Sequence, residues 1–309
     1  MRSVLVTGGA GFIGSHLVRG LLARGDRVRV LDNFSTGKAE NLSGLSGPLE
    51  ILKGDLCDLA IVGQAVRGMD TIFHQAAFVS VPKSMQEPQA CFETNVQGTL
   101  NLLEAARKAN VRQVVLASSA AVYGESQELP LNEQTELQTL SPYAASKQVD
   151  EVYAGMYTRA YGLPVVALRY FNVYGPRQSP DSDYAAAIPI FIRCMLDGIA
   201  PTVYGDGYQR RDFVYVKDVV RANLLAAESS EAVGKAFNVC NGKETSLIDL
   251  LEVLSEVLPG SPPPQFEPPR PGDIYRSLGD PSLAAKTLGF YAEVSLAEGL
   301  AETVAWMRN

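Results

Sequence analysis

The stretch Thr7-Gly8-Gly9-Ala10-Gly11-Phe12-Ile13-Gly14 decides the fold of this chain of 309 residues. It follows a short β-branched run at Val4–Thr7 and opens a helical stretch at Ile13–Ala23. The spacing Gly9-x-Gly11-x-x-Gly14 is that of a tight turn that brings a helix N-terminus against a pyrophosphate, because a Cβ would block such a close approach. Alone the motif is a weak signal, and a purely structural glycine turn is its alternative.

Short apolar runs alternate with helical periodicity through the first half of the chain. We expect strands at Val4–Thr7, Val28–Leu31, Leu49–Lys53, Thr71–His74, Gln113–Ala117 and Val165–Arg169. We expect helices at Ile13–Ala23, Asp58–Val66, Ala90–Ala109 and Tyr143–Tyr161. Strands separated by helices of this length indicate βαβ units, so the predicted class is α/β with a doubly wound, parallel Rossmann sheet.

From about Phe171 the pattern becomes less regular and richer in proline and glycine. The expected elements there are a helix near 185–196, a strand near Phe213–Val216, and helices at Val219–Ala227, Leu247–Leu258 and Leu296–Met307. Residues 261–272 contain six prolines and are expected to form an ordered loop. We therefore predict a dinucleotide-binding domain over 1–170 and a smaller α/β substrate domain over 171–309, with the segment near 212–240 able to return to the first domain.

Composition excludes several classes of function. The net charge of −7 argues against nucleic acid as a main partner. No apolar run reaches the roughly 18 to 20 residues of a membrane span. The four cysteines are far apart and form no CxxC pair, so we expect neither a metal site nor a disulfide framework. These features favour a cytoplasmic protein.

Acidic residues after the second and third expected strands support a dinucleotide site. Asp32 ends the second strand, where a carboxylate accepts hydrogen bonds from ribose hydroxyls. A negative charge there repels a 2′-phosphate, so NAD is favoured over NADP. Asp55 follows the third strand and faces either the adenine or, alternatively, the N-terminus of the next helix as its cap.

A tyrosine and a lysine on one helix face indicate acid–base chemistry. Tyr143 and Lys147 are four residues apart. A free tyrosine, with a pKa of about 10, is a poor base at pH 7, but a nearby ammonium and a positive nicotinamide both favour the phenolate. Ser118 and Ser119 close the fifth strand at the ligand-binding edge of the sheet, where a hydroxyl can share the substrate with Tyr143. An exposed Tyr–Lys pair is the alternative.

Taken together, these motifs resemble the extended short-chain dehydrogenase/reductase family, and most of all its UDP-sugar 4-epimerases. The resemblance covers nearly the whole chain. It rests on the glycine turn, Asp32, Asn95-Val96-Gln97-Gly98-Thr99, Ser118-Ser119-Ala120-Ala121-Val122-Tyr123-Gly124, Tyr143-x-x-x-Lys147, Arg169-Tyr170-Phe171-Asn172-Val173-Tyr174-Gly175-Pro176, Gly205-Asp206-Gly207, Arg210-Arg211-Asp212-Phe213 and Arg270-Pro271-Gly272-Asp273.

The resemblance implies a role for each matching residue. Tyr143 would be the base, Lys147 its electrostatic partner and ribose anchor, and Ser119 the residue that orients the hydroxyl. The NAD-binding residues would be Gly8, Gly11, Phe12, Ile13, Gly14, Asp32, Asn33, Asp55, Leu56, Gln75, Ala76, Ala77, Asn95, Ser118, Tyr143, Lys147 and Tyr170. The UDP-sugar would be held by Ser119, Tyr143, Asn172, Tyr204, Arg211, Arg270, Asp273 and Ser277.

The two residues that follow Ser119 narrow the choice among the reactions of this family. The family's 4,6-dehydratases carry an acidic pair there, whereas this chain has Ala120 and Ala121, which do not titrate. The expected activity is C4 epimerisation of UDP-glucose and UDP-galactose, together with their N-acetyl forms, because the small Ser277 leaves space beside the sugar's C2. A UDP-glucuronate 4-epimerase, a net dehydrogenase or reductase, and an idle NAD-binding regulator remain alternatives. Similar enzymes are homodimers that pair through two long helices, here 90–109 and 143–161.

Overall fold

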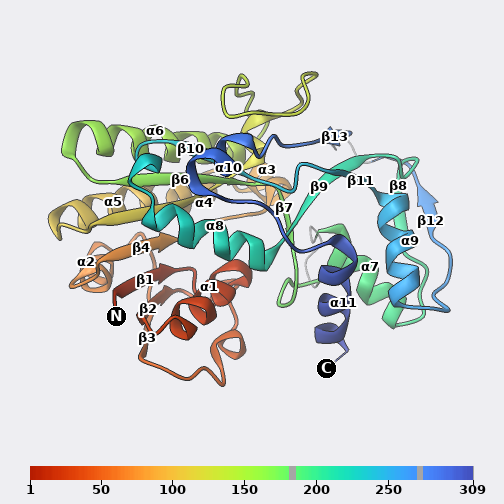
Figure 1. The fold of residues 1–309 in the computed structure, drawn as a ribbon, viewed down its shortest axis with the longest axis horizontal. Coiled ribbons are helices and arrows are strands. Elements are labelled where there is room, and N and C mark those ends of the chain that lie inside the picture. Colours follow the sequence, from red (N-terminus) through yellow and green to blue (C-terminus); the bar gives the residue numbers. More distant parts are fainter. Residues whose placement is uncertain (181–185, 270–273, 309) are drawn as a thin grey trace.

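The computed structural model describes residues 1–180, 186–269 and 274–308. Across these residues a parallel sheet of seven strands forms the centre, in the order β10-β6-β5-β4-β1-β2-β3 (Figure 1). Its strands are β1 (Ser3–Thr7), β2 (Arg27–Asp32), β3 (Leu49–Lys53), β4 (Thr71–His74), β5 (Gln113–Ser119), β6 (Val165–Tyr170) and β10 (Ala236–Val239). Every neighbouring pair is parallel. The α/β class and the doubly wound sheet are confirmed.

Helices cover both faces of this sheet because successive strand residues point to opposite sides. Val4 and Val6 of β1 belong to one buried apolar cluster, while Leu5 between them belongs to another. The first cluster lies under α1 (Phe12–Ala23), α8 (Val216–Glu228) and α10 (Ser282–Leu288). The second lies under α2 (Leu59–Val66), α5 (Gly98–Lys108) and α6 (Pro142–Tyr161).

The helix expected over Ala90–Ala109 is present as an unbroken helical run from Pro88 to Lys108, but it contains a π-helical turn that was not expected. The segment consists of α4 (Pro88–Phe92), a π-helical turn η2 (Glu93–Gln97) and α5. Asn95 lies in the π turn, and its side chain makes hydrogen bonds with the main chain of Phe78. Such π turns are frequent at functional sites. A short helix that was not expected, α3 (Val81–Gln86), precedes α4.

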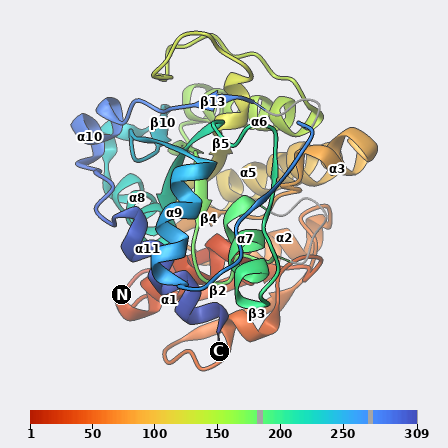
Figure 2. The same ribbon diagram turned by 90° about the vertical axis from the view of Figure 1, so that its right-hand side faces the viewer.

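The second half of the chain, apart from α8, β10 and α10, forms a smaller layer beside the central sheet. It lies to the right of that sheet in Figure 1 and in front of it in Figure 2. A four-stranded sheet contains β7 (Asn172–Tyr174), β9 (Arg210–Tyr215), β11 (Glu244–Ser246) and β13 (Arg276–Ser277), and β8 (Thr202–Tyr204) pairs with β12 (Gln265–Glu267). The helices here are α7 (Ala187–Leu196), α9 (Leu247–Val257) and α11 (Leu296–Met307), which share a third apolar cluster.

Several boundaries in this half differ from those expected. The strand β9 begins at Arg210, and Val216 already starts α8. β10 was not expected as a strand, and it hydrogen-bonds to β6 as the last strand of the central sheet. β12 lies inside the proline-rich stretch that was expected to be a loop. Short helical turns complete the described chain at η1 (Ala39–Leu42), η3 (Ala120–Tyr123) and η4 (Ser230–Ala232).

Candidate active site

The glycine turn lies between β1 and α1. Gly8 has a φ of 67°, and a Cβ on it would lie 2.6 Å from the main-chain nitrogen of Ala76. A Cβ on Gly14 would overlap the carbonyl oxygen of Gly8. A side chain at Gly8 would press on the main chain that follows β4, and one at Gly14 would press on the turn itself, so both positions require glycine for the turn to close tightly. The tight turn brings the N-terminus of α1 to the ligand-binding edge of the sheet.

Asp32 is a fixed part of the same turn. Its Oδ2 accepts a hydrogen bond from Ala10 N at 2.8 Å, and its Oδ1 accepts one from Phe34 N at 2.8 Å. A carboxylate has about four lone-pair sites, so two acceptor positions remain for ribose hydroxyls. Asp55 accepts hydrogen bonds from Asn33 Nδ2 at 2.8 Å and Cys57 N at 2.9 Å, and these contacts lower its pKa. Asp58, not Asp55, caps α2.

Buried polar side chains fill the space below the ends of β4 and β6. His74 lies between the hydroxyls of Thr7 and Thr99, at 2.7 and 2.9 Å, and burial lowers its pKa to about 3. The hydroxyl of Tyr170 accepts a hydrogen bond from Gln75 Nε2 at 3.0 Å, and burial raises the pKa of Tyr170 to about 12. Neither residue is suited to exchange protons near neutral pH, which leaves that task to another group.

Asn95 was expected to touch the cofactor, but it is fully buried behind the cavity wall. Its Oδ1 accepts a hydrogen bond from Phe78 N at 2.7 Å, and its Nδ2 donates to Phe78 O and to Ser146 Oγ. The neighbouring Thr94 lines the cavity instead. Asn95 therefore ties the loop after β4 to α6.

The strand-end serines and the helical tyrosine come together at one edge of the sheet. Ser119 ends β5 and caps η3 by accepting a hydrogen bond from Ala121 N at 3.1 Å. Ser118 donates to Glu151 Oε1 at 2.5 Å. Tyr143 lies in the first turn of α6, and its main-chain N–H donates to Ser84 Oγ at 3.2 Å, which satisfies one of the free donors of that helix end.

Lys147 follows one turn later on α6 and is almost completely buried. Its Nζ lies 3.2 Å from Asp150 Oδ2, and both side chains are closed to solvent. A buried ammonium requires such a partner, because an unpaired charge in the interior costs several kcal/mol.

These residues face a cavity of about 1380 Å³, called the main cavity here. Pockets for a single drug-sized ligand usually have volumes of about 300 to 1,000 Å³, so the main cavity has room for a dinucleotide and a second ligand. All the expected cofactor residues except Asn95 line it. They are Gly8, Gly11, Phe12, Ile13, Gly14, Asp32, Asn33, Asp55, Leu56, Gln75, Ala76, Ala77, Ser118, Tyr143, Lys147 and Tyr170, and Ser119 joins them.

The sequence reasoning missed two arginines that also line the main cavity. Arg177 follows β7 and has a φ of 68°, a conformation that costs a residue with a Cβ about 1–3 kcal/mol. Arg193 comes from α7. Neither guanidinium pairs with a carboxylate within the described part of the chain. Two such groups suit a diphosphate, and the strained backbone at Arg177 is a signal that only the structure reveals.

Of the expected nucleotide-sugar residues, Ser119 and Tyr143 line the main cavity, whereas Asn172, Tyr204, Arg211 and Ser277 are on the smaller layer and outside that lining. Asn172 donates to Asp212 O at 3.2 Å, and Arg211 NH1 donates to the carbonyls of Arg210 and Tyr275. Ser277 in β13 pairs in register with Arg211 in β9, and Tyr204 belongs to β8. Arg270 and Asp273 lie outside the described residues.

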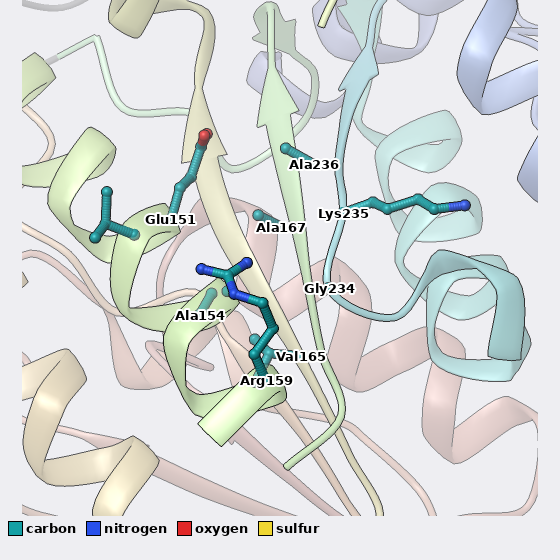
Figure 3. Close-up of a pocket in the computed structure, with 10 residues that line it drawn as sticks. Glu151, Ala154, Arg159, Val165, Ala167, Gly234, Lys235 and Ala236 are labelled. Carbon is teal, nitrogen blue, oxygen red and sulfur yellow. The ribbon is translucent and has the colours of Figure 1, made fainter. Parts of the chain in front are cut away.

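A second, smaller hollow of about 250 Å³ lies between α6, β6 and β10 (Figure 3). Arg159 extends across it, whereas Lys235 points away. Glu151 is the acidic residue of its wall, and its carboxylate is taken by Arg169 at 2.7 and 2.9 Å. None of the expected site residues lines this hollow, so it is not the catalytic centre. Among the described residues no cluster of His, Cys, Asp and Glu is suited to a metal ion.

Architecture and site together define a dinucleotide-dependent enzyme of the short-chain dehydrogenase/reductase class. A family model described as "NAD dependent epimerase/dehydratase family" matches residues 4–240. The UDP-glucose 4-epimerase of Mycolicibacterium smegmatis is 42% identical over an alignment of 309 positions, which covers 99% of this chain and 98% of that protein. The chain belongs to the NAD-dependent epimerase/dehydratase family.

Solved structures are equally similar along the whole chain. A UDP-N-acetylglucosamine 4-epimerase from Methanobrevibacter ruminantium, in complex with UDP-N-acetylmuramic acid, superposes with a TM-score of 0.96 at 43% identity and covers 99% of this chain and 98% of its own. A UDP-glucose 4-epimerase from Thermus thermophilus, in complex with NAD, gives a TM-score of 0.91 at 42% identity, with 99% of both chains covered.

Proposed function

We propose that this protein is a UDP-hexose 4-epimerase that inverts C4 of UDP-glucose and UDP-galactose, and of UDP-N-acetylglucosamine and UDP-N-acetylgalactosamine, with bound NAD. The observation that carries this proposal is that Ser119, Tyr143 and Lys147 face the same cavity as the glycine turn and Asp32. The similarity to epimerases of both substrate types supports it. The division into a dinucleotide part and a sugar part near residue 170 belongs to the same proposal.

The residues present fit NAD. The turn at Gly8 and Gly14 has no space for a Cβ, and Asp32 keeps two acceptor positions beside it. Gly8, Asp32 and Lys147 would hold the cofactor's pyrophosphate and riboses. When bound, NAD supplies a reversible hydride acceptor for C4, so the reaction needs no outside oxidant.

Tyr143 is the residue that moves the proton. It lies in the main cavity, unlike Tyr123, which is fully buried and has its pKa raised to about 12 by burial. Tyr143 takes the proton from the C4 hydroxyl and returns it when the sugar presents its other face. Ser119 orients that hydroxyl, and the ammonium of Lys147 stabilises the phenolate. Arg177 and Arg193 offset the charge of the diphosphate.

A dehydratase is disfavoured by the same geometry. Elimination of water needs an additional acid and base, and the turn η3 that follows Ser119 begins with Ala120 and Ala121. A net dehydrogenase with the same residues would differ by releasing NADH.

The test is incubation with UDP-glucose, UDP-galactose, their N-acetyl forms and UDP-glucuronate, followed by chromatographic separation of epimers and absorbance of NADH. We expect epimers of the hexoses and N-acetylhexosamines without accumulation of NADH. Stoichiometric NADH would indicate a dehydrogenase, and turnover of UDP-glucuronate alone would indicate the uronate epimerase. Protein that neither contains nor binds NAD would overturn the proposal.

We also propose that the protein is a homodimer that pairs through α4, α5 and α6. Phe92 on α4 and Val152 on α6 are 56% and 63% exposed, and a second copy of the chain packed on these helices would remove such apolar area from water. Light scattering at micromolar concentration should give twice the monomer mass, and V152E should give the monomer. A monomer mass for the unmodified protein would refute the dimer.

We also propose that the protein is cytoplasmic. Its four free cysteines agree with a reducing compartment.

No helix of the described residues is long and apolar enough to cross a membrane.

A further inference from the structure

Asp150 is a buried carboxyl group that the mechanism above does not use. It lies on α6, three residues after Lys147, and its side chain is closed to solvent. Its Oδ2 accepts a hydrogen bond from Lys147 Nζ at 3.2 Å, while its Oδ1 has no hydrogen-bond partner among the described residues. Burying a carboxylate with one oxygen unpaired costs free energy, so an apolar residue would serve the helix better if packing were the only requirement.

Asp150 is the counter-charge of Lys147, because the other titratable groups near these two side chains are either neutral or paired with another residue. His74 on β4 stays neutral, because burial lowers its pKa to about 3. Glu151, next in the chain, is held by Arg169. The thiol of Cys91 on α4 has its pKa raised by burial and stays neutral. Burial raises the pKa of Asp150 to about 6, and Lys147 and the side chain of Thr99 on α5 act in the opposite direction.

We propose that Asp150 is a positioning residue of the reaction, whose carboxylate keeps Lys147 charged and oriented beside Tyr143 and the cofactor. This inference rests on the proposed function. Lys147 is useful to the phenolate only as an ammonium, and a buried lysine without a counter-charge loses its proton more easily. Asp150 therefore extends the pH range in which the Ser–Tyr–Lys set works, and it does so without touching substrate.

The test is the pH dependence of kcat and of NAD affinity in D150N. We expect kcat at neutral pH to fall by about 10-fold to 100-fold with KM for the UDP-sugar nearly unchanged. This is less than the roughly 10² to 10⁴ that the proton-transfer group itself contributes, because Asp150 acts only through Lys147. The alkaline limb of the kcat profile should move to lower pH by at least about one unit. NAD binding, measured by calorimetry, should weaken between pH 7 and pH 9 in D150N more than in the unmodified protein.

D218N is the matched control, because Asp218 is a buried carboxyl on α8 that accepts hydrogen bonds from Glu293 N and Val294 N, away from the main cavity. D218N should lower thermal stability and leave the alkaline limb of the kcat profile at the same pH as in the unmodified protein. D150S replaces D150N if the latter does not fold. An alkaline limb and an NAD affinity that do not move in an active, folded variant would overturn the role of Asp150. Absence of epimerisation by the unmodified protein would instead refute the proposed function.

Discussion

The carboxylate of Asp32, at the end of β2, holds the glycine turn of β1 through a 2.8 Å hydrogen bond from the main-chain nitrogen of Ala10. A second hydrogen bond at the other oxygen comes from Phe34 N. The residue that would select the cofactor is thus also the residue that fixes the turn beneath it. The selectivity for the dinucleotide and the conformation of the glycine turn would therefore both depend on the side chain of Asp32.

This double role predicts the behaviour of D32N. Asparagine keeps the size but offers a single oxygen and no charge, so one of the two main-chain contacts and the repulsion of a 2′-phosphate are lost. We expect NAD to bind about tenfold more weakly, and the preference for NAD over NADP to fall by at least about tenfold, or 1.4 kcal/mol. Calorimetric titration with both dinucleotides measures this. D26N removes another buried carboxylate outside the main cavity and should keep the preference; an unchanged preference in D32N would remove Asp32 from cofactor selection.

The assignment of Tyr143 as base predicts a loss of turnover without a loss of binding. In Y143F, kcat should fall by about 10² to 10⁴, the contribution of a positioned acid–base group. The Kd of the UDP-sugar should stay the same, because the phenol does not hold the nucleotide. S119A should have a smaller effect, since orientation is only partly lost. Y153F removes a phenol from the same helix but outside the main cavity and serves as the control. Nearly full activity in Y143F would require a different base.

The elements whose boundaries are set by nearby residues could be predicted from the sequence alone. β1, the glycine turn and α1 follow one another within about twenty residues, and α6 is bounded by a capping Ser141 with Pro142 at its start and by Gly162 in a left-handed conformation at its end. Such features act within a turn or two of chain, so they can be predicted without knowledge of the fold. The same is true of the residues at strand ends, which a parallel sheet gathers at one edge.

Features that depend on distant partners could not be predicted. The strand β10 is short, and it is defined by pairing with β6, about seventy positions earlier. Arg177 and Arg193 reach the main cavity only because the smaller layer folds beside the sheet. Asn95 has the expected residue type, but its π turn directs the side chain to Phe78 instead of the cavity. Register and side-chain direction of this kind are properties of tertiary packing.

The buried His74 predicts a loss of stability in acid. Its pKa of about 3 in the folded protein lies below the ordinary 6.5, so the unfolded chain binds the proton more readily. The stability that neutral His74 contributes is complete above pH 6.5 and is lost as the pH falls toward 3. Between pH 7 and pH 5 this amounts to about 2 kcal/mol. The free energy of unfolding is measured with urea at pH 7 and at pH 5 in the unmodified protein and in H74Q. Its decrease between the two pH values should be smaller in H74Q by about 2 kcal/mol. Equal decreases in both proteins would contradict a neutral, buried His74.

The last prediction concerns the space beside the sugar. Ser277 belongs to β13, where it pairs in register with Arg211 of β9, and its side chain is half-buried. The resemblance to UDP-sugar 4-epimerases implies that Arg270 would hold the uridine and that the position seven residues later, Ser277, would lie near the sugar's C2 substituent. A serine leaves space for an N-acetyl group and offers a hydrogen bond, whereas a tyrosine would fill that space. We therefore expect S277Y to act selectively against the N-acetylated substrate.

The measurement is kcat/KM for UDP-N-acetylglucosamine and for UDP-glucose in the unmodified protein, in S277Y and in S277A. In S277Y the value for the N-acetyl substrate should fall by at least about tenfold, or 1.4 kcal/mol of transition-state stabilisation, while the value for UDP-glucose changes little. S277A keeps the space open and removes only the hydroxyl, so it separates the steric effect from the hydrogen bond. If S277Y lowers both substrates equally, or neither, then Ser277 does not limit the size of the pocket, and acceptance of N-acetylhexosamines must depend on other residues.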